Sequence, residues 1–500
     1  MDVPRKGLAL YRRRQRPAWW AAGALALALG SAGSPPVFAE EVPAEPQALE
    51  ALEALEEVAP EADGDAAPAG LPSLSGLVRR AFEHDAELSR QRFELEATRE
   101  ERPMARSQLL PQVTASGGYL WQDSTNVQTD PEGFGLDQPA QRPGEFDETF
   151  WRLSVQQPLF SLERWRGMER ATAQVGQSEL ELALLEQDLS LQVSEAYVNA
   201  YLASRTLGLL EAQQQALELQ VRQARRAYDL GVGDRINLLE AQSRFDQAMA
   251  DAVQAENQLD DALSELERLT GEFPEFLGFA LGDLSEAALQ RDWGDESAWL
   301  ERIGRNLHVL HAEAERQVAA SDTRVRRGGF YPEVNLNLSY SDRDSDDQLR
   351  TSEDYTASVE VSMPLYRGGY TAASVRQGEL RTRASQEGVE HQRNLAAQEV
   401  RRRLRGLNGS VRRLEALQQA IESSQLFLSA AERGEQLGLR DLVDVLDARA
   451  SLYDQRIQYV ETLGRYLLDR LALQAAVGAL GDDDLEATMD LLDRITRPAN

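Results

Sequence analysis

The chain has 500 residues, 53 basic against 83 acidic residues, a formal net charge of −30 and no cysteine. So acidic a chain repels the phosphates of nucleic acid, which excludes nucleic acid as a partner. The lack of cysteine excludes disulfides, thiol chemistry and a lipid-modified N-terminal cysteine.

The N-terminal residues 1–39 have the layout of a cleaved signal peptide. A basic head is followed by a short apolar run over 19–30 and by the small residue Ala39. The alternative is a membrane anchor, but the run is shorter than the ~20 residues that span a bilayer. Residues 40–70 are rich in Ala, Glu and Pro, which predicts an acidic disordered leader.

The rest of the chain is a duplication with an offset of about 207 residues. Residues 224–242 (ARRAYDLGVGDRINLLEAQ) align without a gap on residues 431–449 (AERGEQLGLRDLVDVLDAR). This period is far longer than the ~20–50 residues of a solenoid unit, so each copy is half a protein. We expect a first repeat over 71–271 and a second over 298–480, each opening with a helix.

Each repeat then carries two segments in which apolar and polar residues alternate. In the clearest, Val334, Leu336 and Leu338 alternate with polar neighbours. A period of two predicts strands with one polar face, which fits a soluble sheet and a transmembrane barrel equally well. Long polar loops, 122–150 and 341–354, separate the paired strands. The expected strands lie near 112–121, 150–158, 331–340 and 355–364.

Very long helices follow the strands. Residues 163–229 and 371–437 contain no proline, and residues 235–270 and 441–478 return antiparallel to them. Apolar and small residues recur at alternating spacings of three and four, in the same register in both repeats, as in a coiled coil or a helical barrel. The seam residues of the first repeat are Leu207, Leu210, Gln214, Leu217, Val221, Ala224 and Tyr228.

The two repeats are joined by a mixed segment, 272–297, which we expect to be a connector around the middle of the structure. An acidic, partly helical tail, 481–500, follows the second repeat.

The turns between the long helices share the pattern Leu-Gly-x-x-Asp. A glycine can take the left-handed conformation that ends a helix, and an aspartate can cap the next helix. The turns therefore predict two antiparallel hairpins whose tips lie far from the strands. The tip residues are Leu230, Gly231 and Asp234 in the first repeat and Leu437, Gly438 and Asp441 in the second.

Only the second tip carries a charged cluster, formed by Arg440, Asp444 and Asp447. In one interpretation Asp444 stabilises the helix N-terminus and pairs with Arg440. In the other, several copies meet around an axis and the aspartates form an acidic ring that restricts a pore.

In their order, these features resemble the TolC family of outer-membrane efflux channels. The features are the signal, the duplication, LLPQ and FYPE before the first strand of each repeat, QPLF and MPLY near the end of the second, the RGG after the fourth strand, and both tips. The resemblance implies a mixed fold, an all-α coiled-coil barrel plus a transmembrane β-barrel. Each protomer has duplicated halves with four strands and long antiparallel helices. A homotrimer then forms a twelve-strand barrel and a periplasmic α-helical tunnel, with 272–297 as an equatorial connector.

The resemblance also implies a function. It indicates a passive exit duct in the outer membrane of a Gram-negative bacterium, serving a tripartite efflux or type I secretion system. Arg440, Asp444 and Asp447 match the family's periplasmic gate, which opens like an iris. The tips would dock a periplasmic adaptor (membrane fusion) protein that links the duct to an inner-membrane pump of the RND, ABC or MFS type.

Two other classes of function compete with the duct. A periplasmic coiled-coil scaffold that never enters the membrane is the alternative to the duct. An enzyme is the least favoured class, because His84, His308, His311 and His391 are scattered and no third metal ligand accompanies His308 and His311. We expect no catalytic residue, no cofactor and no metal.

Overall fold

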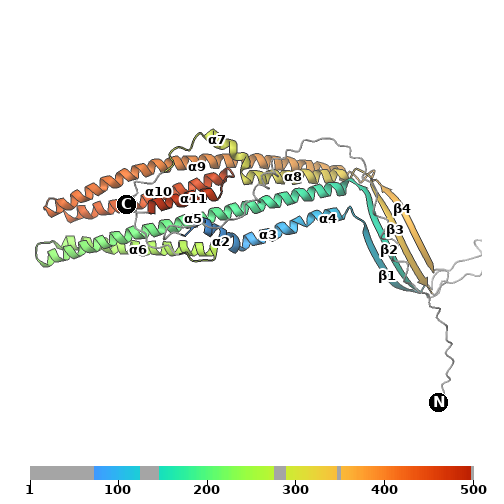
Figure 1. Ribbon diagram of the computed structural model, residues 1–500, viewed down its shortest axis with the longest axis horizontal. Coiled ribbons are helices and arrows are strands. Elements are labelled where there is room, and N and C mark those ends of the chain that lie inside the picture. Colours follow the sequence, from blue (N-terminus) through green and yellow to red (C-terminus); the bar gives the residue numbers. More distant parts are fainter. Residues whose placement is uncertain (1–71, 124–145, 275–288, 346–350, 497–500) are drawn as a thin grey trace, which may run out of the picture. The chain divides into compact units, whose positions relative to one another are not determined.

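The computed structural model describes residues 72–123, 146–274, 289–345 and 351–496 (Figure 1). The expected signal peptide, the acidic leader and the centre of the loop 122–150 lie outside the described residues.

Three short helices open the first repeat: α2 (Leu74–His84), α3 (Ala86–Arg99) and α4 (Glu101–Ser107). Asp85 ends α2 because its backbone is extended, with φ −67° and ψ 120°. Its carboxylate accepts a hydrogen bond from the N–H of Leu88 at 2.6 Å, which caps α3. One aspartate therefore both interrupts the apolar helical pattern and restarts it.

Four strands form one antiparallel sheet in the order β1-β2-β3-β4 (Figure 1). The register places Leu338 beside both Val155 and Ala357, so the apolar residues of neighbouring strands share a face. The pairing of β2 with β3 joins the two repeats. The strands are β1 (Gln112–Gln122), β2 (Phe146–Ser161), β3 (Glu333–Ser345) and β4 (Ser352–Ser362).

Two very long helices follow the strands. α5 (Leu162–Asp229) and α9 (Tyr370–Gln436) have 68 and 67 residues, about 100 Å each at ~1.5 Å per residue. α6 (Arg235–Thr270) packs along α5, and α10 (Leu442–Ala476) packs along α9, which makes two hairpins. α8 (Leu307–Gly328) contacts both α5 and α9 (Figure 1).

The main hydrophobic core lies where the two hairpins and the short helices meet. Tyr197 of α5 is fully buried, and its hydroxyl donates to the carbonyl of Pro72 at 2.9 Å. Burial raises the pKa of Tyr459 in α10 to about 12, so this phenol stays neutral. Gly464 of α10 lies directly against the side chain of Leu202 in α5, where a Cβ would clash. The long helices therefore approach closely at this level.

The remaining elements surround this core. α7 (Glu296–Leu300) and a 3₁₀ helix (Glu301–Arg305) precede α8. α11 (Asp482–Thr496) contacts α2 and α10 and buries Leu485 and Leu492. Across the described residues, no helix combines the length and apolar character of a membrane span.

Candidate functional site

Both hairpins turn at a glycine in the left-handed conformation. Gly231 has φ 74° and Gly438 has φ 70°, values that residues with a Cβ rarely adopt. In the second turn the N–H of Leu439 donates to the carbonyl of Gly434 at 2.8 Å, and the first turn makes the equivalent bond at 3.0 Å. The same helix-ending turn is thus built twice.

Asp234 and Asp441 are the N-cap residues of α6 and α10. Neither carboxylate accepts a hydrogen bond from the helix it precedes, so the expected side-chain caps are wrong. Both residues are exposed at the tips, where water can satisfy the free N–H groups of the first turn.

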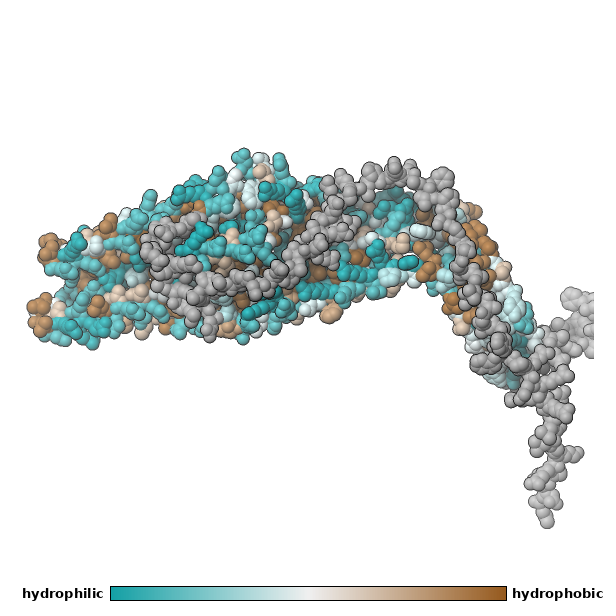
Figure 2. Space-filling model, viewed as in Figure 1, coloured by the Kyte–Doolittle hydropathy of each residue, from teal (hydrophilic) through white to brown (hydrophobic). Residues whose placement is uncertain are grey.

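The tips expose large apolar side chains. Leu230 and Val232 are 78% and 81% exposed, and Leu437 and Leu439 are 74% and 78% exposed. Figure 2 shows hydrophobic residues at the ends of both hairpins. Burying one such side chain gains about 1.5–3 kcal/mol, so a group of them left in water marks an interaction site.

The charged cluster of the second tip makes two different contacts. Arg440 pairs with Asp444 at 3.5 Å, and its guanidinium lies 5.4 Å from the ring centroid of Phe427. Asp447 instead pairs with Arg244 of α6, in the first hairpin, at 2.8 Å. The paired side chains are between 41% and 59% exposed, so each pair contributes only ~0.2–1 kcal/mol to stability.

Arg244 is a site residue that sequence reasoning missed. It also pairs with Glu240 of its own helix at 3.1 Å, so it links Glu240 to Asp447. At an offset of 207 its counterpart is Ser451, so the duplication gives no signal for it. Only the packing of one hairpin against the other reveals this contact.

An apolar cluster beneath the charges holds the two hairpins together. Leu442 and Leu446 of α10 are 8% and 1% exposed. The first-hairpin residues that form one cluster with them are Leu217, Val221, Ala241 and Ala248. The charged residues of the second tip therefore lie next to a hydrophobic contact between the two hairpins.

The histidines lie away from the tips. His311 of α8 is 3.3 Å from Glu181 of α5. Within the part of the chain that the structure describes, no three His, Cys, Asp or Glu side chains gather as metal ligands.

This fold is that of the outer-membrane channels. The structure of the CmeC outer membrane channel of Campylobacter jejuni is similar with a TM-score of 0.70 at 14% sequence identity, over 88% of this chain and 98% of CmeC. The four antiparallel strands and long helices are a TolC-like fold, as in the trimeric structures of that family. The predicted fold class is confirmed.

The outer membrane efflux protein family matches residues 77–272 and 301–479, and the chain belongs to this family. The outer membrane protein TolC of Vibrio cholerae is 28% identical over 420 residues, covering 83% of this chain and 92% of TolC. The alkaline protease secretion protein AprF of Pseudomonas aeruginosa is 28% identical over 414 residues, covering 81% of this chain and 84% of AprF.

Membership decides between the classes of function. The protein is an outer-membrane efflux channel of the TolC and AprF type, in a Gram-negative bacterium. It transports and is not an enzyme. The channel prediction is therefore confirmed over the periplasmic scaffold, and membership of the TolC family implies a trimer.

Proposed function

We propose that three copies of the chain build a passive duct through a twelve-strand barrel and a helical tunnel. The observation that carries this proposal is the pair of open sheet edges. Among the residues that the structure describes, β1 pairs only with β2, and β4 pairs only with β3. In lipid, an unpaired strand edge costs several kcal/mol for each unsatisfied backbone group, so β4 of one protomer pairs with β1 of the next.

The polar face of the sheet lines the lumen in this proposal. Asn335 lies opposite Glu360, and Asn337 lies opposite Ser358, on the face away from the apolar residues. Together with the acidic tunnel walls, this lining favours the passage of cations, or at least does not bind them tightly enough to hold them in the lumen. The opposite, apolar face contacts outer-membrane lipid.

The hairpin tips are the docking surface for a periplasmic adaptor protein. Each tip presents an exposed apolar side chain on both sides of its glycine. These side chains are Leu230 and Val232 in the first tip and Leu437 and Leu439 in the second. Exposed apolar groups on rigid turns suit a protein partner. Through the adaptor, the duct serves an inner-membrane pump of the RND, ABC or MFS type.

The gate consists of Arg440, Asp444 and Asp447 at the second tip. Three copies around an axis bring three pairs of aspartates together, and this ring narrows the pore and attracts cations. The pairing of Asp447 with Arg244 supports a closed position in which the second hairpin is held against the first. Opening breaks this pair and swings the second hairpin outward, like an iris.

The cargo is exported by an efflux or a type I secretion system. A relative named for alkaline protease secretion, 28% identical, supports protein export. The relatives named for TolC are of similar identity and leave drug and metal efflux equally open.

Single-channel currents in planar bilayers test the duct and its gate. We expect Asp444→Ala with Asp447→Ala to weaken block by divalent cations roughly tenfold, because two carboxylates per protomer leave the ring. The matched control is Asn237→Ala with Glu240→Ala, the same repeat positions on the first tip. Unchanged block in the Asp444 and Asp447 variant contradicts the gate, and the absence of any channel current contradicts the duct.

A further inference from the structure

The charge of the chain is inverted where the helices adjoin the strands. Over the whole chain, 83 acidic residues outnumber 53 basic ones. In the segments 99–107, 162–170, 322–331 and 365–383, thirteen arginines outnumber six acidic residues. A positive collar therefore lies next to the sheet on an otherwise negative protein.

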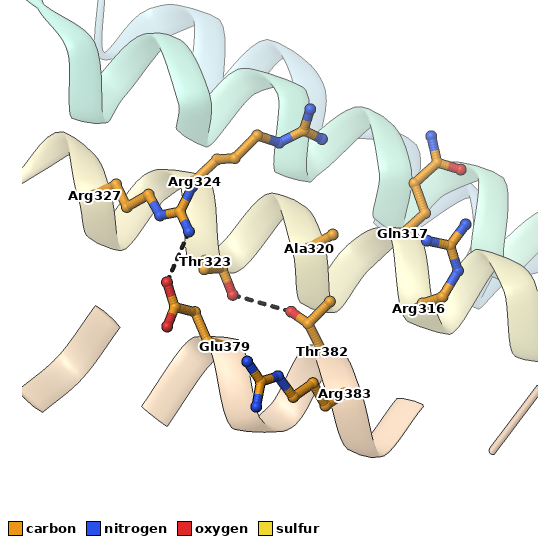
Figure 3. A pocket seen from close by; sticks show the side chains of 9 residues that line it. All are labelled: Arg316, Gln317, Ala320, Thr323, Arg324, Arg327, Glu379, Thr382 and Arg383. Carbon is orange, nitrogen blue, oxygen red and sulfur yellow. Dashed lines mark hydrogen bonds and ion pairs between the residues drawn. The ribbon is translucent and has the colours of Figure 1, made fainter. Parts of the chain in front are cut away.

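From this collar as far as Arg316, α8 and α9 enclose an open cleft of about 830 Å³ (Figure 3). Arg316, Arg324 and Arg327 of α8 and Arg383 of α9 line it. Glu379 is the only carboxylate among its lining residues. The formal charge of these five side chains is +3, so the cleft suits an anion.

The arginines differ in how far they are already neutralised. Arg327 pairs with Glu379 at 2.7 Å. Arg324 donates to the hydroxyl of Ser321 at 2.8 Å and lies 3.9 Å from a carboxylate oxygen of Glu169 in α5. Among the described residues, Arg316 and Arg383 have no carboxylate within ion-pair distance. Guanidinium groups hold phosphate through paired hydrogen bonds, and two such groups without a carboxylate partner, one from each helix, face this cleft.

The cleft lies just beyond an aromatic belt. Large aromatic side chains are exposed where the helices join the strands, among them Trp165 at 54%, Tyr331 at 53% and Tyr370 at 70%. Figure 2 shows hydrophobic residues gathered at this junction. Aromatic residues at such a position mark the boundary between hydrocarbon and headgroups. Arg327 lies in the last turn of α8, four residues before Tyr331, so it lies on the order of 5 Å from this boundary, within the headgroup layer.

The cleft and helix α7 lie on the same side of the α8–α9 pair. Glu379 and Arg383 belong to a stripe on α9, at helical spacings of three and four, that continues to Arg393 and Arg401. Arg393 pairs with a carboxylate of α8 at 2.7 Å, and Arg401 pairs with Glu296 of α7 at 2.7 Å. If α7 lay inside the duct, it would narrow the lumen. We therefore place α7, and with it the cleft, on the outer surface of the helical tunnel, a step that rests on the proposed function.

We propose that the α8–α9 cleft binds the phosphate of an anionic phospholipid from the inner leaflet of the outer membrane. Arg316, Arg324 and Arg383 would bind the headgroup. Arg327 would donate hydrogen bonds to both the phosphate and Glu379. Bound lipid then fixes the vertical position of the channel beneath its aromatic belt and ties α8 to α9. Interfacial arginines attract anionic lipid, so removal of two of them should weaken its retention measurably.

Native mass spectrometry of the purified full-length protein with added phosphatidylglycerol tests this proposal. We expect Arg324→Gln with Arg383→Gln to lower lipid retention roughly tenfold, and the wild type to prefer phosphatidylglycerol to phosphatidylethanolamine. The matched control is Arg376→Gln with Arg381→Gln, which removes the same charge from exposed positions of α9 outside the cleft.

Three outcomes overturn the lipid site: equal loss in the control variant, retention unchanged in the cleft variant, or equal retention of both lipids. Displacement of the lipid by micromolar inorganic phosphate makes the cleft a site for free phosphate and overturns the lipid assignment. The conductance of both variants is measured in parallel. A normal conductance with lost lipid selectivity supports the cleft, and lost conductance in the wild type would instead contradict the duct.

Discussion

The two hairpin tips have the same turn and opposite surroundings. Leu239 and Leu446 occupy equivalent positions, five residues after the aspartate that precedes each returning helix. Leu239 is 57% exposed, whereas Leu446 is 1% exposed and packs on the first hairpin. Duplication has therefore preserved the residue and the turn but not the burial. The first hairpin serves as the support, and the second rests on it.

The charges follow the same division. Asp447 of the second tip pairs with Arg244 of the first hairpin. Its counterpart Glu240 pairs with the same arginine, but from within the same helix, α6. Arg244 is thus shared between the supporting hairpin and the resting one. A movable gate needs a contact of this kind, weak enough to break and specific enough to reform.

The largest expected effect separates the two leucines. Leu446→Ala should lower the free energy of unfolding by about 3 kcal/mol, because it leaves a cavity between the hairpins. Leu239→Ala should cost less than ~1 kcal/mol, because most of its side chain is in water. Denaturant titration of the purified trimer, followed by helical circular dichroism, measures both. Equal losses would show that Leu239 is as well covered in the assembled protein as Leu446.

A smaller and equal effect is expected at the two turn glycines. No neighbouring atom lies within 4 Å of a Cβ built at Gly231 or Gly438, so only the positive φ opposes a side chain. Alanine at either position should cost about 1 kcal/mol through backbone strain. The same titration compares them. A markedly larger loss at Gly438 would mean that the second turn is held by more than its own backbone.

Much of this architecture could be predicted from local patterns. The alternation in 331–340 and the proline-free heptads in 371–437 depend only on neighbours in the chain, and the fold class they predict is confirmed. The turns at Gly231 and Gly438 are predictable for the same reason, and both glycines have the expected positive φ. A repeat found twice also strengthens each local signal.

What could not be predicted depends on contacts between distant segments. The partner of Asp447 lies 203 residues away in the chain, on a different hairpin. The capping bonds expected of Asp234 and Asp441 are absent because exposed helix ends have water as an alternative partner. Likewise, the helical pattern near the start of the first repeat gave no sign that Asp85 would divide it.

The smallest expected effect on stability comes from breaking the ion pair between Arg244 and Asp447. This change also tests most directly how the two tips differ. Because Arg244 and Asp447 are 41% and 59% exposed, Asp447→Asn should cost only ~0.2–1 kcal/mol in unfolding free energy. If this pair holds the gate closed, three copies act together, and the open probability in planar bilayers should rise roughly tenfold.

A charge swap completes this test. Arg244→Asp and Asp447→Arg should each raise the open probability alone, and the double variant should return it toward the wild-type value, because the pair is restored in reverse. Glu240→Gln is the matched control, since it removes a carboxylate from Arg244 without touching the contact between hairpins. Additive effects in the double variant would mean that Asp447 acts through the pore ring alone. The difference between the tips would then lie in the charge that each presents to the axis.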